Sequence, residues 1–436
     1  MARASYPQAK KLKRELTSKK VNDILSGMKI KRKIYNQIYK HMSEKEITML
    51  IGPRQSGKTT IMKQVQKDLL KEKMETVYLN LDIEKDIEVL ESQEKLLQFL
   101  KLHIKNTGYV FIDEFQKKKN AGVFLKGLYD MDLPYKFIIS GSGSIELKEK
   151  TYESLAGRKR IFTIYPVSFE EFALYKCDYK YDTLKEIHNI EPEKEKLLFN
   201  EYMSYGGYPK VVITEDKNEK YAIINEIVQS FLHKDVLTLI KYEKLDDFQK
   251  LIKILGTYNG SMLEYTNLSN ATGLSPKTIK NYIRYLEETH IIKRITPFSK
   301  KRIGEITKMP TLYFIDIGFL HYSLGSFGSL QSEKEGLLFQ NIIWRMLEEL
   351  FENKGASINY WRTKTHQEVD FVIDYQNTLS ACEIKYSSKK ISTSSLYSFQ
   401  RKYPKSNLYI INKGGNTVEK EAVRVVPYYE LEVFNL

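Results

Sequence analysis

The first residues that could do chemistry form a glycine-rich segment, Gly52-Pro-Arg-Gln-Ser-Gly57-Lys58-Thr59. It matches the pattern G-x-x-x-x-G-K-[ST], in which backbone N–H groups surround phosphates, the Lys reaches the β- and γ-phosphates and the hydroxyl binds Mg²⁺. The glycines permit backbone angles closed to other residues, and the N-terminus of a following helix favours anions. The segment therefore predicts a nucleoside triphosphate site made of Gly52, Pro53, Arg54, Gln55, Ser56, Gly57, Lys58, Thr59 and Thr60.

A second motif carries acids, in the run Tyr109-Val-Phe-Ile-Asp113-Glu114. Apolar residues ending in two acids predict a buried parallel strand that delivers carboxylates to the sheet edge where ligands bind. Asp113 would order Mg²⁺, and Glu114 would be the general base that activates water. With Lys58 as a catalytic cation, the expected chemistry is hydrolysis of ATP, with ATP and Mg²⁺ as cofactors.

The elements that must position these residues can be inferred from the flanking sequence. The apolar run 47–51 precedes the glycine-rich loop and a helix-compatible segment follows it, which is the strand–loop–helix context of a phosphate site. Another apolar run, 76–82, lies between the two motifs in the sequence, and residues 136–142 follow them. An added strand between the phosphate-loop strand and the acidic strand, with a catalytic Glu, resembles the additional-strand division of ATPases.

Three polar residues would complete the site. Ser140 and Ser142 end the last of these strands, where such ATPases place a residue that senses the γ-phosphate, although turn chemistry beside the neighbouring glycines is the alternative. Arg158 is a candidate for neutralising charge in the transition state, either in its own subunit or in a neighbouring one. A surface or ion-paired arginine is the alternative for Arg158.

Together these motifs resemble those of a known family. The resemblance rests on Gly-Pro-Arg-Gln-Ser-Gly-Lys-Thr-Thr, Phe-Ile-Asp-Glu-Phe-Gln, Ser-Gly-Ser, and Ala-Gly-Arg followed by Tyr-Pro-Val-Ser-Phe-Glu-Glu-Phe. They are similar to the prokaryotic AAA-type P-loop ATPases of archaea and bacteria that carry a C-terminal domain of unknown function. The resemblance covers the chain from about residue 34 onward. It implies an ATPase fold and a link to DNA, with a winged helix and a restriction-endonuclease-like fold in the second half.

The middle of the chain predicts a helix-turn-helix. A short helix, a turn at Gly273 and a longer helix follow one another, and Ser275 and Pro276 suit the N-cap and the first helical position. Helical spacing predicts a buried face of Ile279, Tyr282, Ile283 and Leu286. The polar positions that would enter a DNA groove are Lys277, Thr278, Lys280, Asn281 and Arg284. Residues 290–298 would add a wing strand, and protein docking or simple packing is the alternative role.

The C-terminal third contains the spacing D-x12-E-x-K on two strand-like segments, with Asp370, Glu383 and Lys385. Side chains alternate along a strand, so Glu383 and Lys385 share one face and can meet Asp370. The two carboxylates would hold a second Mg²⁺ against a phosphodiester, with Lys385 stabilising charge. This resembles the PD-(D/E)-x-K nuclease core, but Gln340 stands where that family usually has an acid and is a poorer ligand for a hard cation. An active nuclease, a degenerate docking fold and an incidental salt bridge all remain open.

Charge and composition narrow the classes of function. The chain has 436 residues and a net charge of +14, and residues 1–40 carry twelve Lys or Arg against two acids. Such an arm would attract polyanions through counterion release, although a solvated tail is the alternative. Cys177 and Cys382 are too few for a disulfide framework or a cysteine zinc site. No apolar run approaches the roughly 20 residues that span a bilayer, so we expect a cytoplasmic protein with no membrane partner.

These inferences define an expected architecture. It is an α/β chain with a basic segment at 1–34, a P-loop core of the additional-strand AAA type at 35–166, a helical lid at 167–240, a winged helix at 241–305 and a nuclease-like α/β domain at 306–436. The run from Phe231 to Asp235, within an apolar helix near the expected lid, is interpreted as mainly structural, and communication of the nucleotide state to the second half is the alternative. The expected function is a Mg²⁺-dependent ATPase acting on DNA, as a monomer or a homo-oligomer. A signalling or defence NTPase that binds a protein partner and an ATP-gated DNA nuclease are the alternatives.

Overall fold

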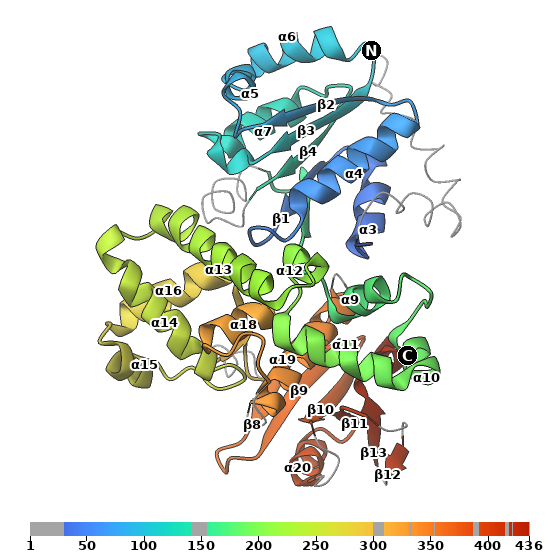
Figure 1. Cartoon of the computed structure of the whole chain (residues 1–436), viewed down its shortest axis with the longest axis vertical. Coiled ribbons are helices and arrows are strands. Elements are labelled where there is room, and N and C mark those ends of the chain that lie inside the picture. Colours follow the sequence, from blue (N-terminus) through green and yellow to red (C-terminus); the bar gives the residue numbers. More distant parts are fainter. Residues whose placement is uncertain are drawn as a thin grey trace. The chain divides into compact units, whose positions relative to one another are not determined.

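The computed structural model describes residues 30–141, 155–299, 309–330, 334–352, 354–386, 392–414, 418–420 and 422–435, and Ser142 lies outside them. The chain divides into two units (Figure 1). The first comprises the chain up to Val167 together with Ser230–Leu239 and Glu288–His290, and the rest forms the second. The expected lid, winged helix and C-terminal domain therefore share the second unit almost entirely, and their mutual boundaries stay predictions. In the described part of the chain, no helix combines the length and apolarity required to cross a membrane.

The first unit is built on a five-stranded sheet in which all neighbours are parallel. Its order is β2 (Glu75–Asn80), β3 (Gly108–Asp113), β4 (Tyr135–Ser140), β1 (Ile47–Ile51) and β5 (Lys159–Thr163). Strands β1, β3 and β4 are buried throughout, as their nearly continuous apolar sequences require. The added strand between β1 and β3 is β4, whereas β2, which lies between them in sequence, forms the edge. The predicted α/β class with a P-loop-type sheet is confirmed.

Helices cover both faces of this sheet (Figure 1). On one face, α3 (Ile34–Lys40) and α4 (Lys58–Lys71) pack Ile38 and Val65 against Phe111 and its neighbours. On the other face, α6 and α7 pack Leu100 and Leu125 against alternate residues of the same strands. The remaining elements of this unit are α5 (Glu84–Val89), α6 (Gln93–His103), α7 (Ala121–Asp130) and the short η2 (His41–Ser43), η3 (Phe115–Lys117) and η4 (Val236–Thr238).

The second unit begins with a helical group. Its first helix starts with a capping box between Ser168 and Glu171. The group comprises α9 (Phe169–Lys176), α10 (Leu184–Ile190), α11 (Pro192–Tyr205), α12 (Pro209–Ile213) and α13 (Lys217–Lys234). Helix α13 belongs to both units, because its residues from Ser230 onward group with the first.

A three-helix module with a two-stranded antiparallel sheet follows. It consists of η5 (Tyr242–Lys244), α14 (Leu245–Thr257), α15 (Tyr265–Thr272), α16 (Pro276–Glu288), β6 (Ile292–Ile295) and β7 (Thr311–Phe314). Gly273 ends α15 in the left-handed region, with φ 75°. The hydroxyl of Ser275 accepts a hydrogen bond from the N–H of Thr278 at 3.1 Å, as expected of an N-cap. Strand β6 lies within the residues expected to form a wing strand, whereas β7 lies beyond the predicted boundary at residue 305, and the winged-helix assignment stays a prediction.

The C-terminal part is a six-stranded mixed sheet in the order β12-β13-β11-β10-β9-β8. Strands β9 and β10 are antiparallel, whereas β10, β11 and β13 run parallel to one another. Leu396 and Phe399 of α20 pack against this sheet. The elements are α18 (Ile317–Ser323), α19 (Glu335–Phe351), β8 (Ser357–Arg362), β9 (Glu368–Tyr375), β10 (Thr378–Lys385), α20 (Ser394–Lys402), β11 (Asn407–Asn412), β12 (Val418–Lys420), β13 (Val423–Pro427) and η6 (Tyr428–Asn435).

Candidate active site

The glycine-rich loop connects β1 to α4 through backbone angles that require glycine. Gly52 has φ 145° and Gly57 has φ 102°. A Cβ at Gly52 would lie 2.2 Å from the carbonyl oxygen of Ile164, so no larger residue fits there. Helix α4 begins at Lys58, which places its unpaired N-terminal N–H groups next to the loop. The loop therefore has the form of an anion site.

Lys58 is the buried cation of this loop. Its ammonium group donates hydrogen bonds to the carbonyl oxygens of Gly52 at 3.0 Å and Pro53 at 2.8 Å. Burial lowers the pKa of Lys58 to about 8, and the negative charges of Glu114 and Asp235 oppose that shift. The side chain is consequently charged at neutral pH, as phosphate binding requires.

Asp113 lies at the carboxyl end of β3 and is held by three hydroxyl groups. Thr59 Oγ1 and Tyr78 OH each donate to Oδ2 at 2.8 Å, and Ser140 donates to Oδ1. The predicted neighbours Thr59, Asp113 and Ser140 are thus brought together. The contact of Tyr78 was not expected, because β2 carries no sequence motif.

The Thr59 hydroxyl and the Asp113 carboxylate are adjacent oxygen donors, the kind that Mg²⁺ prefers. The buried Ser56 hydroxyl has no hydrogen-bond partner among the described residues, whereas Thr60 is exposed. A polar group without a partner at this position fits a loop that takes a polar ligand. The residues present therefore fit a Mg²⁺–triphosphate group, with Thr59 and Asp113 as its metal ligands.

Glu114 has an unusual backbone, with φ 56° in the left-handed region. Its N–H donates to Asp113 Oδ1 at 3.1 Å and to Ser140 Oγ at 3.3 Å, which explains how this conformation is held. Its carboxylate accepts a hydrogen bond from the amide of Gln116. The geometry places Glu114 directly beside Asp113, as the general-base prediction needs, with Gln116 fixing the side chain.

Two contacts to the loop come from segments without a motif. Arg54 Nε donates to Asp235 Oδ2 at 2.6 Å, so the segment interpreted as structural reaches the loop. Arg32 donates to the carbonyl oxygens of Ser56 at 3.1 Å and Tyr165 at 2.7 Å. No local pattern in the sequence marked Arg32 or Asp235, because both act over long sequence separations.

Arg158 lies away from the loop within its own chain. It directly precedes β5 and its carbonyl accepts a hydrogen bond from the N–H of Ile47, the first residue of β1. The loop follows the other end of β1. The Arg158 side chain pairs with Asp130 at 2.8 Å. This pair fits the ion-paired alternative that the sequence left open, whereas the position does not fit action in the same subunit, and action on a neighbouring subunit stays a prediction.

The helix-turn-helix segment has the two predicted faces. Ile279, Tyr282, Ile283 and Leu286 of α16 are buried. Thr278 is half-buried, and its hydroxyl lies 2.9 Å from that of Ser275 at the start of the helix. The remaining candidate residues, Lys277, Lys280, Asn281 and Arg284, are exposed.

The C-terminal carboxylates are brought together as the spacing predicts. The β9–β10 register pairs Phe371 with Cys382, so Asp370 and Glu383 occupy the next opposed positions. Burial and the charge of Glu383 raise the pKa of Asp370 to about 7. Burial likewise raises the pKa of Glu383. Both acids therefore hold their protons to a higher pH than ordinary carboxyl groups do.

Each of these carboxylates already has a donor from its own chain. Gln340 Nε2 donates to Asp370 Oδ1 at 2.8 Å, and the N–H of Ile384 donates to Oδ2 at 2.7 Å. Lys385 Nζ donates to Glu383 at 2.8 Å. Among the residues that the structure describes, no group of three or more His, Cys, Asp or Glu side chains is placed to hold a metal. This donor set does not fit the second Mg²⁺ site.

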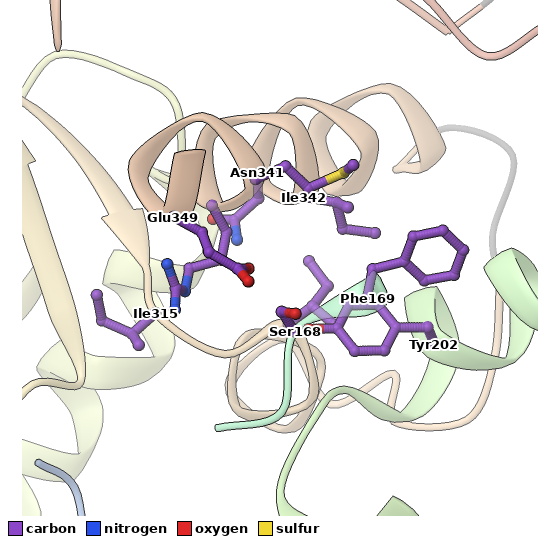
Figure 2. Close-up of a pocket in the computed structure, with 10 residues that line it drawn as sticks. Ser168, Phe169, Tyr202, Ile315, Asn341, Ile342 and Glu349 are labelled. Carbon is purple, nitrogen blue, oxygen red and sulfur yellow. The ribbon is translucent and has the colours of Figure 1, made fainter. Parts of the chain in front are cut away.

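A separate pocket lies in the second unit among α9, α11, α19 and the segment after β7 (Figure 2). Asn341 lines it, but its amide is bonded to the backbone N–H and carbonyl of Phe314 at 3.1 and 2.9 Å. Ser168, also on the lining, is used in the capping box of α9. Both polar groups make contacts within the unit, and none of the predicted site residues lines this pocket.

The fold and the loop geometry define the class of protein, a P-loop AAA-type ATPase with C-terminal domains of unknown function. Family models agree with this assignment. Residues 44–173 match an AAA domain, and residues 196–329 and 335–431 match two different domains of unknown function. The chain hydrolyses ATP, as its AAA domain specifies.

Relatives of similar length are found in archaea and bacteria. An uncharacterized protein of Methanocaldococcus jannaschii is 27% identical over 362 residues, which cover 81% of this chain and 78% of the relative. An uncharacterized protein of Mycobacterium tuberculosis is 23% identical over 344 residues, which cover 78% of this chain and 70% of the relative.

Solved structures of AAA proteins resemble the chain distantly. The FIGL-1 AAA domain in complex with ADP gives a TM-score of 0.30 at 13% identity, covering 66% of this chain and 92% of that one. AMPPCP-bound DnaA from Aquifex aeolicus gives a TM-score of 0.27 at 13% identity, and the match covers 58% of this chain and 86% of that one. Similarity of this degree carries no argument about the function of this chain.

Proposed function

We propose that this ATPase is Mg²⁺-dependent and that its nucleotide cycle regulates or drives action on DNA. The observation that carries the DNA part is helix α16. One face of the helix is buried, while its other face exposes three cations and an amide in the second position of a helix-turn-helix. Such a helix presents hydrogen-bond donors to base edges and phosphates. The net charge of +14 adds a general attraction to polyanions.

The loop residues divide the work of hydrolysis. Lys58 binds the phosphates, and the hydroxyl of Thr59 with the carboxylate of Asp113 would hold Mg²⁺, which neutralises charge on the phosphate oxygens. Glu114 accepts a proton from the attacking water, in a position fixed by Gln116 and Ser140. Arg158 would serve the site of a neighbouring subunit, so this part of the proposal requires a homo-oligomer.

The decisive experiment measures binding of duplex, branched and single-stranded DNA by electrophoretic shift, with and without ATP, at two salt concentrations. The variant combining Lys277→Ala, Lys280→Ala and Arg284→Ala should weaken binding by about 10²-fold near 0.1 M salt and flatten the salt dependence, because fewer counterions are released. The matched control replaces three exposed lysines of the first unit, Lys101, Lys105 and Lys126.

Two outcomes would redirect the proposal. If no nucleic acid shifts even at low salt, the DNA role is wrong and a protein partner of the C-terminal half takes its place. If both triple variants lose affinity equally, binding is a matter of total charge and α16 has no special role. The nuclease alternative has less support, because the side chains around Asp370 and Glu383 do not fit a metal.

A further inference from the structure

A carboxylate from a distant segment contacts the phosphate-binding loop. Asp235 directly follows α13, which ends at Lys234. Its Oδ2 accepts a hydrogen bond from Arg54 Nε at 2.6 Å. The Asp235 side chain is 6% exposed and that of Arg54 is 21% exposed. The ion pair is therefore largely removed from water, so its two charges are only weakly screened.

We propose that Asp235 is a further positioning residue of the ATP site, which sets the affinity for the triphosphate by competing with it for the guanidinium of Arg54. The inference deepens the proposed role of the loop and rests on it. Arg54 is the third residue of the loop, and phosphates are strong acceptors for a guanidinium group. A triphosphate bound in the loop brings negative charge next to a cation that Asp235 already engages.

The effect of Asp235 extends to the second cation of the loop. Its negative charge acts on Lys58, where together with the charge of Glu114 it opposes the effect of burial on the ammonium group. The two cations that would contact the phosphates thus share one carboxylate neighbour. Removing that charge frees the guanidinium of Arg54 for the ligand and removes a repulsion from the triphosphate, and both consequences strengthen binding, while Lys58 loses part of what keeps it charged.

The test is a double-mutant cycle on the binding of AMPPCP with Mg²⁺, measured by calorimetry on the full chain. Asp235→Asn should bind AMPPCP about three- to tenfold more tightly than the wild type does. A change of this size lies between the interaction energies measured for exposed and for buried charge pairs. In the Arg54→Ala background the same change should tighten binding much less, because only the repulsion between Asp235 and the triphosphate is then relieved. Asp235→Glu keeps the charge and should bind like the wild type.

Steady-state kinetics and unfolding separate this role from a structural one. The KM for ATP should fall in Asp235→Asn without a rise in kcat, and Asp246→Asn, an exposed acid, is the matched control. The inference is overturned if Asp235→Asn lowers the melting temperature but leaves the affinity unchanged, or if the full tightening persists in the Arg54→Ala background. If the wild type itself gives no heat with AMPPCP, the proposed ATP site fails instead.

Discussion

The two charged clusters of this chain contain similar residue types but differ in what holds their carboxylates. In the first unit, Asp113 accepts hydrogen bonds from three neutral hydroxyl groups and from the backbone N–H of Glu114. In the second unit, Asp370 accepts from an amide and a backbone N–H, and Glu383 accepts from the ammonium group of Lys385. A hydroxyl group donates a hydrogen bond to a carboxylate but leaves its negative charge uncompensated, whereas the ammonium group of Lys385 brings a full positive charge.

A motif therefore identifies the residues, but their neighbours decide the chemistry. Thr59 can turn its oxygen to a cation while Asp113 contributes its charge, which makes the pair suited to Mg²⁺. At the second cluster, Gln340 offers Asp370 a donor where a third acid would be needed. Burial also raises the pKa of Asp370 to about 7, which further weakens it as a metal ligand.

Disabling hydrolysis in the first unit should produce a larger change than any variant of the second cluster. Glu114→Gln keeps the shape of the side chain but removes the proton acceptor, so kcat should fall by about 10²- to 10⁴-fold while ATP binding persists. Phosphate release and nucleotide binding measure the two effects. Glu88→Gln, an exposed acid in the same unit, is the control, and normal turnover in Glu114→Gln would reject the general-base role.

The second cluster can be tested by restoring the missing acid. Gln340→Glu replaces a donor to Asp370 with a like charge in a half-buried position, and should lower the unfolding free energy by about 2–4 kcal/mol in EDTA. Mn²⁺ should recover part of that loss, because three acids can then share a cation. Thermal unfolding with EDTA and with Mn²⁺ measures both effects.

The matched control for this change is Gln376→Glu, at an exposed turn between β9 and β10. If Gln340→Glu is as stable as the wild type without metal, then the amide of Gln340 is not what holds Asp370. A wild-type protein already stabilised by Mn²⁺ without nucleotide, to an extent that Asp370→Asn abolishes, would remove the distinction between the clusters.

The pH dependence of the first cluster is a further test. Lys58 binds phosphate as the charged form, and its pKa of about 8 means that this form is lost as the pH rises through 8. The value of kcat/KM for ATP should therefore decline above pH 8, approaching about tenfold per pH unit. Burial is the main cause of this lowered pKa, and the charges of Glu114, Asp235, Arg54 and Asp113 modify it.

Lys58→Arg provides the control for the pH profile, because a guanidinium group stays charged throughout this range. Its kcat/KM will be lower but should remain flat above pH 8. A decline of the same shape in both proteins would assign the titration to another group.

Loss of the Tyr78 hydroxyl group should change kcat only modestly. Tyr78→Phe removes one of two hydrogen bonds to Asp113 Oδ2, and should lower kcat by about three- to tenfold, as the loss of a single hydrogen bond allows. Steady-state ATP hydrolysis measures the change. A loss as large as that of Glu114→Gln would mean that Tyr78 has a catalytic role instead of a positioning one.

Much of the site followed from the sequence because its signals are local. The loop from Gly52 to Thr59, the acids after β3 and the two faces of α16 each depend on residues within one or two adjacent elements. Periodicity and glycine placement encode such features directly. The pairing of Asp370 with Glu383 was also accessible, since the two strands are consecutive and antiparallel.

The remaining features depend on contacts between distant segments. Asp235 is 181 residues from Arg54, and Tyr78 is 35 residues from Asp113. The place of β4 between β1 and β3 is a matter of sheet order, which apolar runs do not specify. The donors that occupy Asp370 were hidden for the same reason, because Gln340 lies on a helix 30 residues earlier.

The first unit is discontinuous in the sequence, and this has a practical consequence for truncation. Residues 44–173 match the AAA domain, yet Ser230–Leu239 and Glu288–His290 also belong to that unit. A fragment that stops near residue 173 would lose the acid paired with Arg54 and the ring contact between Tyr165 and His290. Enzymology on such a shortened protein would report a loop with altered electrostatics, so the ATPase should be studied in the intact polypeptide.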